Sequence, residues 1–132
     1  MIVIPGVGGL SMKLKMMVVD DSEAFREIMR ELLVRVGFDI VIEAKDYDEA
    51  IANFKKEKPD VIFIDMILPD KSGVETTKSI LEIDPKAIVI AMSAMINKKL
   101  IKEALSAGAK DFLFKPTNEM ALNTVIQMWG GE

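Results

Sequence analysis

Five residues with charged or hydroxyl side chains follow four short apolar segments of the chain. Each of these segments has the length and composition of a strand buried on both faces. Because ligands of an open parallel sheet bind at the carboxyl ends of its strands, we expect the five side chains to converge at one edge. They are Asp20, Asp21, Asp65, Ser93 and Lys115.

Three carboxylates, a hydroxyl and an ammonium group in one cleft favour a particular chemistry. The carboxylates repel one another, and a divalent cation relieves that repulsion. Mg²⁺ suits such hard oxygen ligands and also accepts phosphate oxygens. A carboxylate beside that cation can attack phosphorus to form an aspartyl phosphate, with Lys115 and Ser93 holding the phosphoryl oxygens. These residues therefore predict Mg²⁺-assisted phosphoryl transfer.

The composition of the 132-residue chain excludes several other function classes. The absence of His and Cys excludes zinc sites, cysteine nucleophiles, Ser-His-Asp triads and a histidine phosphodonor. A net charge of -4 offers no basic field for nucleic acid. No apolar stretch reaches the roughly 18 residues of a membrane span, and the first residues lack the pattern of a signal peptide. We expect a cytoplasmic protein that neither binds nucleic acid directly nor inserts into a membrane.

Five short apolar runs alternate with segments of helical periodicity, a pattern typical of βαβ units around a parallel sheet. The first helical segment is the clearest, and Gly37 ends it. Asp46 and Glu49 form a capping pair for the second. We expect strands at 16–19, 40–42, 61–64, 87–92 and 112–114. The inward face of the first helix is predicted to hold Phe25, Ile28, Met29, Leu32, Leu33 and Val36.

The length fits one domain, so the sequence predicts a single α/β domain with five parallel strands and five helices. The periodic pattern begins only near residue 14. We therefore divide the chain into an N-terminal extension over 1–13 and one domain over 14–130, with no output domain attached.

Four segments of this sequence resemble the receiver domain of two-component response regulators, most closely the single-domain chemotaxis type. They are VVDDSEAFR, PDVIFIDMILPDKSGVE, AMSA and AGAKDFLFKP, in family order and at family-like spacing within residues 14–129. The resemblance implies a flavodoxin-like three-layer α/β/α sandwich with strand order 2-1-3-4-5. It implies a phosphoacceptor switch rather than an enzyme, with a sensor histidine kinase as phosphodonor and an unknown downstream protein as target. The expected state is a monomer or a weak phosphorylation-dependent dimer.

The resemblance also implies the metal ligands and the phosphoacceptor. It makes Asp65 the phosphoacceptor and Asp20 and Asp21 the acidic pair that organises Mg²⁺. Asp65 itself and the backbone carbonyl of Ile67 are the remaining protein ligands.

A second group of residues is implied to sense phosphorylation. Ser93 is the hydroxyl residue that moves toward the phosphoryl group, and Phe112 is the aromatic residue that changes rotamer with it. Lys115 is the lysine of the family motif, and its bond to Pro116 is expected to be cis. The face formed by the fourth helix, fifth strand and fifth helix is implied to transmit the signal.

The sequence departs from many chemotaxis-type members at three positions. Ile67 and Met95, each two residues beyond a site residue, are apolar where polar side chains often orient the hydrolytic water. We therefore predict slow self-dephosphorylation. Phe112 stands where tyrosine is frequent, which removes a hydroxyl from the moving aromatic side chain.

Other interpretations of the same residues remain open at this point. The pair Asp20 and Asp21 can simply cap the first helix, and Asp65 can be a turn residue. Ser93 can be a helix-capping or loop hydroxyl. Lys115 can be a solvated surface charge, and Phe112 can serve packing alone.

Two other function classes also use a strand-end site on such a sheet. A haloacid-dehalogenase-type phosphatase needs a second aspartate two residues after its nucleophile, where this chain has Ile67. A flavin-binding electron carrier needs a glycine- and hydroxyl-rich phosphate loop after the first strand, where Asp20 and Asp21 would repel the phosphate.

Overall fold

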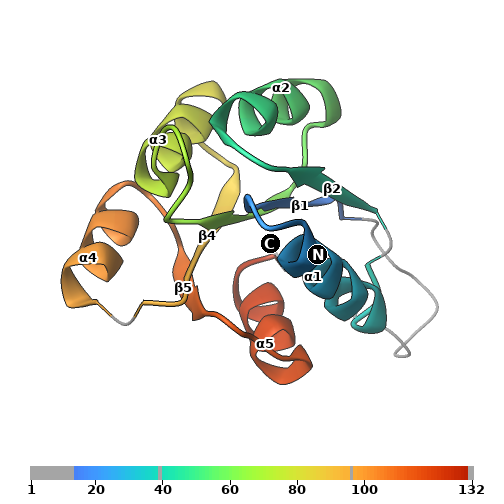
Figure 1. Ribbon diagram of the computed structural model, residues 1–132. Coiled ribbons are helices and arrows are strands. Elements are labelled where there is room, and N and C mark those ends of the chain that lie inside the picture. Colours follow the sequence, from blue (N-terminus) through green and yellow to red (C-terminus); the bar gives the residue numbers. More distant parts are fainter. Residues whose placement is uncertain (1–13, 39, 96, 131–132) are drawn as a thin grey trace.

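The computed structural model describes residues 14–38, 40–95 and 97–130. Within these residues, five strands alternate with five helices along the chain (Figure 1). The elements are β1 (Met16–Val19), α1 (Glu23–Arg35), β2 (Val41–Ala44), α2 (Tyr47–Glu57), β3 (Val61–Asp65), α3 (Gly73–Ile83), β4 (Ile88–Ser93), α4 (Lys98–Ser106), β5 (Asp111–Phe114) and α5 (Glu119–Trp129).

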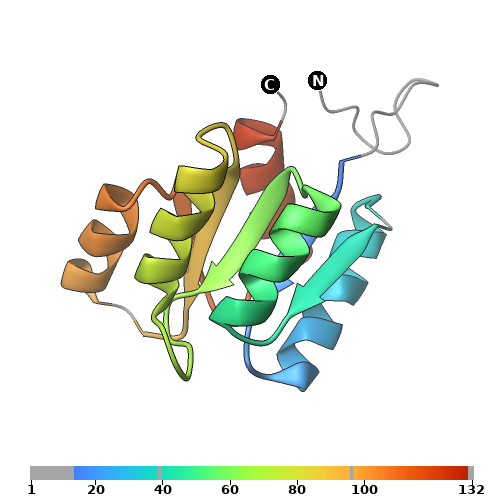
Figure 2. The ribbon, with the colours of Figure 1, turned by 90° about the horizontal axis from the view of Figure 1, so that it is seen from above.

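The five strands form one parallel sheet with the order β2-β1-β3-β4-β5, which confirms the predicted topology. Figure 2 shows the strands running in a common direction. The first strand lies at the point where the strand order reverses, between β2 and β3. Val19, its last residue, pairs with Ala44 of β2 and with Ile64 of β3. The chain after β1 and the last residue of β3 are therefore neighbours at one edge of the sheet.

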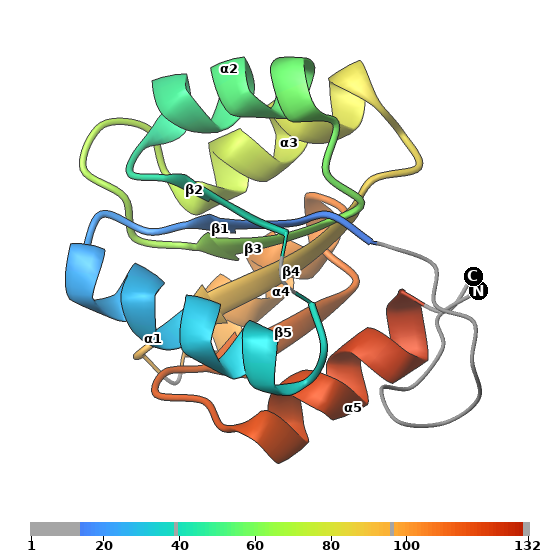
Figure 3. The same ribbon diagram turned by 90° about the vertical axis from the view of Figure 1, so that its right-hand side faces the viewer.

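Helices cover both faces of the sheet, with α1 and α5 on one side and α2 and α3 on the other (Figure 3). Side chains along β1 alternate between the two cores that result. Met16 and Val18 pack in the core between the sheet and helices α1 and α5. Met17 and Val19 pack in the core on the opposite face, to which α2, α3 and α4 contribute. A strand buried on both faces has no polar alternation, which explains the continuous apolar runs of the sequence.

Each helix begins at a polar residue whose side chain accepts a hydrogen bond from a backbone N–H of the first turn. Ser72 and Glu75 form a full capping box at the start of α3. At the start of α2, Asp46 caps the backbone N–H of Glu49 as predicted, but the Glu49 carboxylate accepts from the backbone N–H of Lys45. Gly37 has a φ of 107° after α1, the left-handed conformation expected of a residue that ends a helix.

Some details differ from the sequence-based predictions, among them the ends of two strands and one position of α1. Asp65 and Ser93 are the last residues of β3 and β4, not the first residues beyond them, because backbone pairing extends to both. Ile28 was predicted to face inward but is 50% exposed, since Met29, Leu32 and Leu33 form the buried stripe of α1. The predicted extension over 1–13 lies outside the described residues. In the part of the chain that is described, no helix has the length and apolar character needed to cross a bilayer.

Candidate functional site

Three of the predicted site residues share one local backbone arrangement. Asp20, Asp65 and Ser93 each accept a hydrogen bond from the backbone N–H two residues further on. These side-chain turns fix the direction of the side chain where the chain leaves its strand. The distances are 2.9 Å from Ser22 N to Asp20 Oδ1, 3.0 Å from Ile67 N to Asp65 Oδ1 and 3.0 Å from Met95 N to Ser93 Oγ.

Lys115 joins the ends of β1 and β3. Its Nζ lies 2.6 Å from Asp20 Oδ2 and 3.0 Å from Asp65 Oδ2. The same ammonium group lies 4.2 Å from the centre of the Phe25 ring, which is the geometry of a cation–π contact. Lys115 follows β5, where its backbone N–H donates to the Ser93 carbonyl at 2.9 Å, and its bond to Pro116 is cis as expected. One cation from the end of β5 thus reaches two carboxylates.

The acids of the site could hold a divalent cation. Asp20, Asp21 and Asp65 each offer a carboxylate oxygen, and these three atoms lie within 4.8 Å of one another. Asp20 is fully buried and Asp65 is 6% exposed, whereas Asp21 faces solvent. Oxygen donors from two or more carboxylates beside open solvent match the preference of Mg²⁺, which keeps several of its waters. The donor set therefore fits the predicted metal.

Burial and charge act in opposite directions on the ionisable groups of the site. Burial raises the pKa of Asp65 above its ordinary value, although the Ile67 N–H and the Lys115 ammonium both favour the charged form. Burial alone would lower the pKa of Lys115, but its hydrogen bonds to Asp20 and Asp65 outweigh that effect and raise it. Lys115 is therefore a permanent cation at neutral pH, while the charge of Asp65 is costly to maintain.

Comparison with known proteins identifies the family. A family model described as the response regulator receiver domain matches residues 16–127. This chain belongs to that family. The chemotaxis protein CheY of Thermotoga maritima is 35% identical over 102 residues, which cover 77% of this chain and 85% of that protein. Receiver domains of two-component systems are signalling switches, and phosphorylation of an aspartate is their general function.

Two solved structures are also similar to this receiver domain. The chemotaxis protein CheY4 of Vibrio cholerae has a TM-score of 0.82 at 27% identity, covering 89% of this chain and 99% of that one. A response regulator of Burkholderia pseudomallei has a TM-score of 0.78 at 26% identity, covering 85% of this chain and 65% of that one. That structure is described with a phosphorylated aspartic acid, a calcium ion and citrate. The family assignment decides against the phosphatase and flavin-carrier alternatives.

The receiver domain brings some of the predicted site residues into direct contact and others only near one another. Lys115 contacts Asp20 and Asp65 through its side chain, and Asp21 completes the acidic group. Ser93 is 1% exposed and contacts Lys115 through its backbone.

The remaining two predicted residues are Ile67, which follows β3, and Phe112, which lies on β5. Ile67 reaches Asp65 through its backbone N–H, and the role of its carbonyl stays a prediction. Phe112 pairs with Ala91, and its ring centre lies 5.3 Å from that of Phe114. Its role in switching stays a prediction as well.

Gly73 has a structural role that could not be predicted from the sequence. It begins α3, and its N–H donates to the Met66 carbonyl at 3.0 Å. A Cβ at this position would collide with the carbonyl oxygen of Asp65 and lie 2.5 Å from Cα of Met66. Only glycine lets α3 approach the end of β3 so closely. The signal available in the sequence was a glycine between the third apolar run and the helical segment that follows it.

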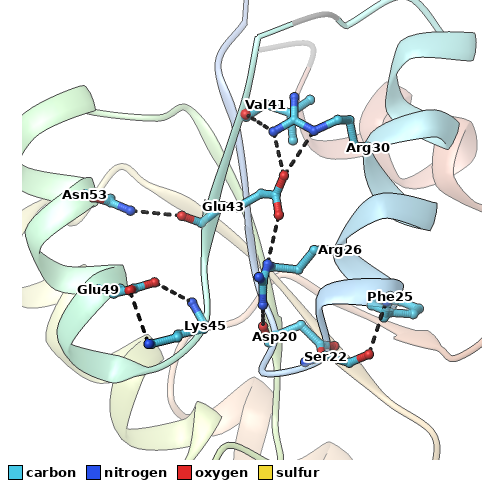
Figure 4. Close-up of polar contacts among 10 residues, drawn as sticks. All are labelled: Asp20, Ser22, Phe25, Arg26, Arg30, Val41, Glu43, Lys45, Glu49 and Asn53. Atoms are coloured by element: carbon cyan, nitrogen blue, oxygen red, sulfur yellow. Dashed lines mark hydrogen bonds and ion pairs between the residues drawn. The ribbon is translucent and has the colours of Figure 1, made fainter.

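Phe25 and Arg26 also contact residues of this site, and Glu43 reaches it through Arg26, although helical periodicity predicted only an inward position for Phe25. The Arg26 guanidinium joins the backbone carbonyl of Asp20 to the Glu43 carboxylate (Figure 4). The Phe25 ring contacts the Lys115 ammonium. Helical periodicity assigns a residue to a face of its helix, but it does not show which neighbouring element that face meets.

Proposed function

We propose that this chain is a single-domain response regulator that accepts a phosphoryl group from a sensor histidine kinase on Asp65. The observation that carries the proposal is the double contact of Lys115 Nζ with the buried carboxylates of Asp20 and Asp65, beside the exposed Asp21. Such a group pairs a carboxylate nucleophile with a fixed cation and a set of metal ligands. The phosphorylated aspartate and calcium ion described for the Burkholderia pseudomallei relative support it.

In this proposal, Asp20, Asp21, Asp65 and the Ile67 carbonyl hold Mg²⁺, which when bound neutralises charge on the phosphoryl oxygens. A carboxylate oxygen of Asp65 forms the new bond to phosphorus while the bond from phosphorus to the donor histidine nitrogen breaks. The electron pair of that bond stays on the imidazole. Hydrolysis later returns the Asp65 carboxylate and inorganic phosphate.

The remaining site residues hold the transferred group. Lys115 exchanges a carboxylate contact for a phosphoryl oxygen, and its cationic side chain keeps part of the charge balanced in both states. The Ser93 hydroxyl moves to a second phosphoryl oxygen, and Phe112 changes rotamer in response. The altered surface of α4, β5 and α5 then binds an unknown downstream protein.

The proposal also includes the extent of the domain, its location in the cell and its oligomeric state. The receiver unit spans residues 14–130, preceded by an extension over 1–13, and works in the cytoplasm. It is a monomer or a weak phosphorylation-dependent dimer, and it needs no direct contact with nucleic acid or membrane.

Intact mass measured after treatment with acetyl phosphate and Mg²⁺ tests the phosphoacceptor. Wild type is expected to gain one phosphoryl group and Asp65→Asn none. Asp70→Asn, which changes an exposed aspartate of the same β3–α3 connection, is the matched control and is expected to react as wild type does. Phosphorylation of Asp65→Asn to the wild-type extent would refute the proposal. A pull-down with both forms of wild type then tests whether the surface changes.

A further inference from the structure

Arg26 connects the acidic site to the edge of the sheet. Its side chain is only 14% exposed, and its Nη1 donates to the backbone carbonyl of Asp20 at 2.7 Å. On its other side, Nε donates to Glu43 Oε1 at 2.8 Å, so one planar guanidinium spans α1, the end of β1 and β2 (Figure 4). None of the ligand or phosphoryl contacts proposed above uses this residue.

Both backbone polar groups of Asp20 are thereby attached to β2. Its N–H donates to the carbonyl of Ala44 at 3.0 Å, and its carbonyl is held to Glu43 through Arg26. That carbonyl belongs to the peptide group between Asp20 and Asp21. The orientation of this peptide group sets the directions in which the two neighbouring carboxylates leave the chain.

Glu43 is itself held firmly. Arg30, one turn further along α1, donates to Glu43 Oε2 from Nε at 3.0 Å and from Nη2 at 2.6 Å, and Nη2 also donates to the Val41 carbonyl. Burial alone would raise the pKa of Glu43, but Arg30 and Arg26 together lower it. Glu43 is therefore a fixed anion. Arg30 shares Glu43 with Arg26, but the structure shows no hydrogen bond from Arg30 to Asp20.

We propose that Arg26, anchored by Glu43, is a positioning residue that sets the Mg²⁺ affinity of the site by holding the Asp20–Asp21 peptide group. The inference rests on the proposed function, because it concerns the same metal ligands. Groups that orient metal ligands typically change metal affinity about 10- to 100-fold when they are removed. Lysine can replace this arginine only in part, since a single ammonium lacks the rigid fork that reaches two acceptors at once.

The sign of the effect separates positioning from simple electrostatics. Removing a cation near an acidic site should by itself tighten the binding of Mg²⁺, because less positive charge opposes the ion. Loss of positioning should weaken it. Arg26→Met and Arg30→Met change the net charge equally and both remove an ion pair with Glu43, but only Arg26→Met frees the Asp20 carbonyl.

Calorimetric titration of the whole protein with Mg²⁺ measures the effect. We expect Arg26→Met to weaken Mg²⁺ binding about tenfold and Arg26→Lys to weaken it less, as is usual for groups that orient ligands. Arg30→Met is expected to stay within about twofold of wild type. Thermal unfolding in EDTA compares the stability of the two methionine variants. A purely structural role of Arg26 would predict similar losses of stability and equal Mg²⁺ affinities in both variants.

The results of the Mg²⁺ titrations distinguish failure of the positioning role from failure of the proposed function. Equal affinities in Arg26→Met and wild type, tighter binding in Arg26→Met, or equal weakening in Arg26→Met and Arg30→Met would overturn the positioning role alone. Wild type that binds no Mg²⁺ would overturn the proposed function as well. If Arg26→Met does not fold, Glu43→Gln replaces it, since it keeps Arg26 but removes the charge that anchors it. Unchanged affinity in Glu43→Gln would then overturn the inference.

Discussion

Replacing Asp65 by asparagine should stabilise the protein in the absence of divalent cations, although it removes the proposed phosphoacceptor. Asp65 is 6% exposed, and burial raises its pKa, so its charged form is costly in the folded state. Asparagine has nearly the same shape and can still accept the hydrogen bond from the Ile67 N–H. The substitution therefore removes a buried charge while preserving the local turn.

The distances in the site give the size of the expected effect. At an effective dielectric constant of about 20, the attraction between Asp65 and Lys115 at 3.0 Å is about 5.5 kcal/mol. Repulsion from Asp20, at no more than 4.8 Å, is at least about 3.5 kcal/mol, and the exposed Asp21 adds about 1 kcal/mol in a water-like dielectric. Attraction and repulsion nearly cancel, so the burial cost of several kcal/mol for one ion decides the sign.

Because asparagine keeps one hydrogen bond and loses the ionic contact with Lys115, we expect a net gain of about 1–2 kcal/mol in the free energy of unfolding. For a domain of this size that corresponds to a rise in Tm of about 4–8 °C. Differential scanning calorimetry in EDTA near neutral pH measures it. Asp70→Asn makes the same change in net charge outside the site and should leave Tm within about 1–2 °C of wild type.

The pH dependence provides a second check. A carboxyl group with a raised folded-state pKa destabilises the protein above that pKa, and this penalty disappears as pH falls through the folded value toward the unfolded one. The advantage of Asp65→Asn should therefore be greatest near neutral pH and shrink in acid. A variant that melts at or below the wild-type temperature in EDTA, or an equal gain in Asp70→Asn, would refute the reasoning.

Three further predictions concern other parts of the site. Ile67→Asn with Met95→Glu should shorten the lifetime of the phosphorylated protein about fivefold, since one added hydrogen bond to the attacking water contributes about 1 kcal/mol; an unchanged decay of the phosphorylated mass would reject this. Gly73→Ala should lower the free energy of unfolding in urea by about 1–3 kcal/mol, because the new Cβ collides with the backbone at the end of β3; an unchanged urea midpoint would contradict it. Phe25→Leu should slow phosphorylation by acetyl phosphate about two- to fivefold, since the Lys115 ammonium loses an aromatic contact that contributes about 0.5–1 kcal/mol. Phe25→Tyr, which keeps an aromatic face, should react as wild type does, and equal rates in both variants would argue against this contact.

Much of the architecture could be predicted from the sequence because apolar runs and helical periodicity are both local signals. Apolar runs located all five strands to within two residues, helical periodicity predicted a helix after each strand, and Gly37 ended α1 as predicted. Periodicity failed at Ile28, which lies at the margin of the helical stripe, because a pattern along one helix does not give the width of the surface that the helix covers. The strand order came from family resemblance, since nothing in an isolated strand specifies its neighbour.

The sequence by itself determined which chemical groups stand at the strand ends, namely the acids of 20, 21 and 65, the hydroxyl of 93 and the amine of 115. Only the tertiary structure decided which of them touch. Lys115 meets Asp20 across 95 residues of chain, because the sheet brings the carboxyl ends of β1, β3 and β5 to one edge. The contacts of Arg26 with Glu43 and of Gly73 with the end of β3 likewise exist only once separate elements have packed. Such contacts depend on distances between elements, and sequence periodicity contains no information on those distances.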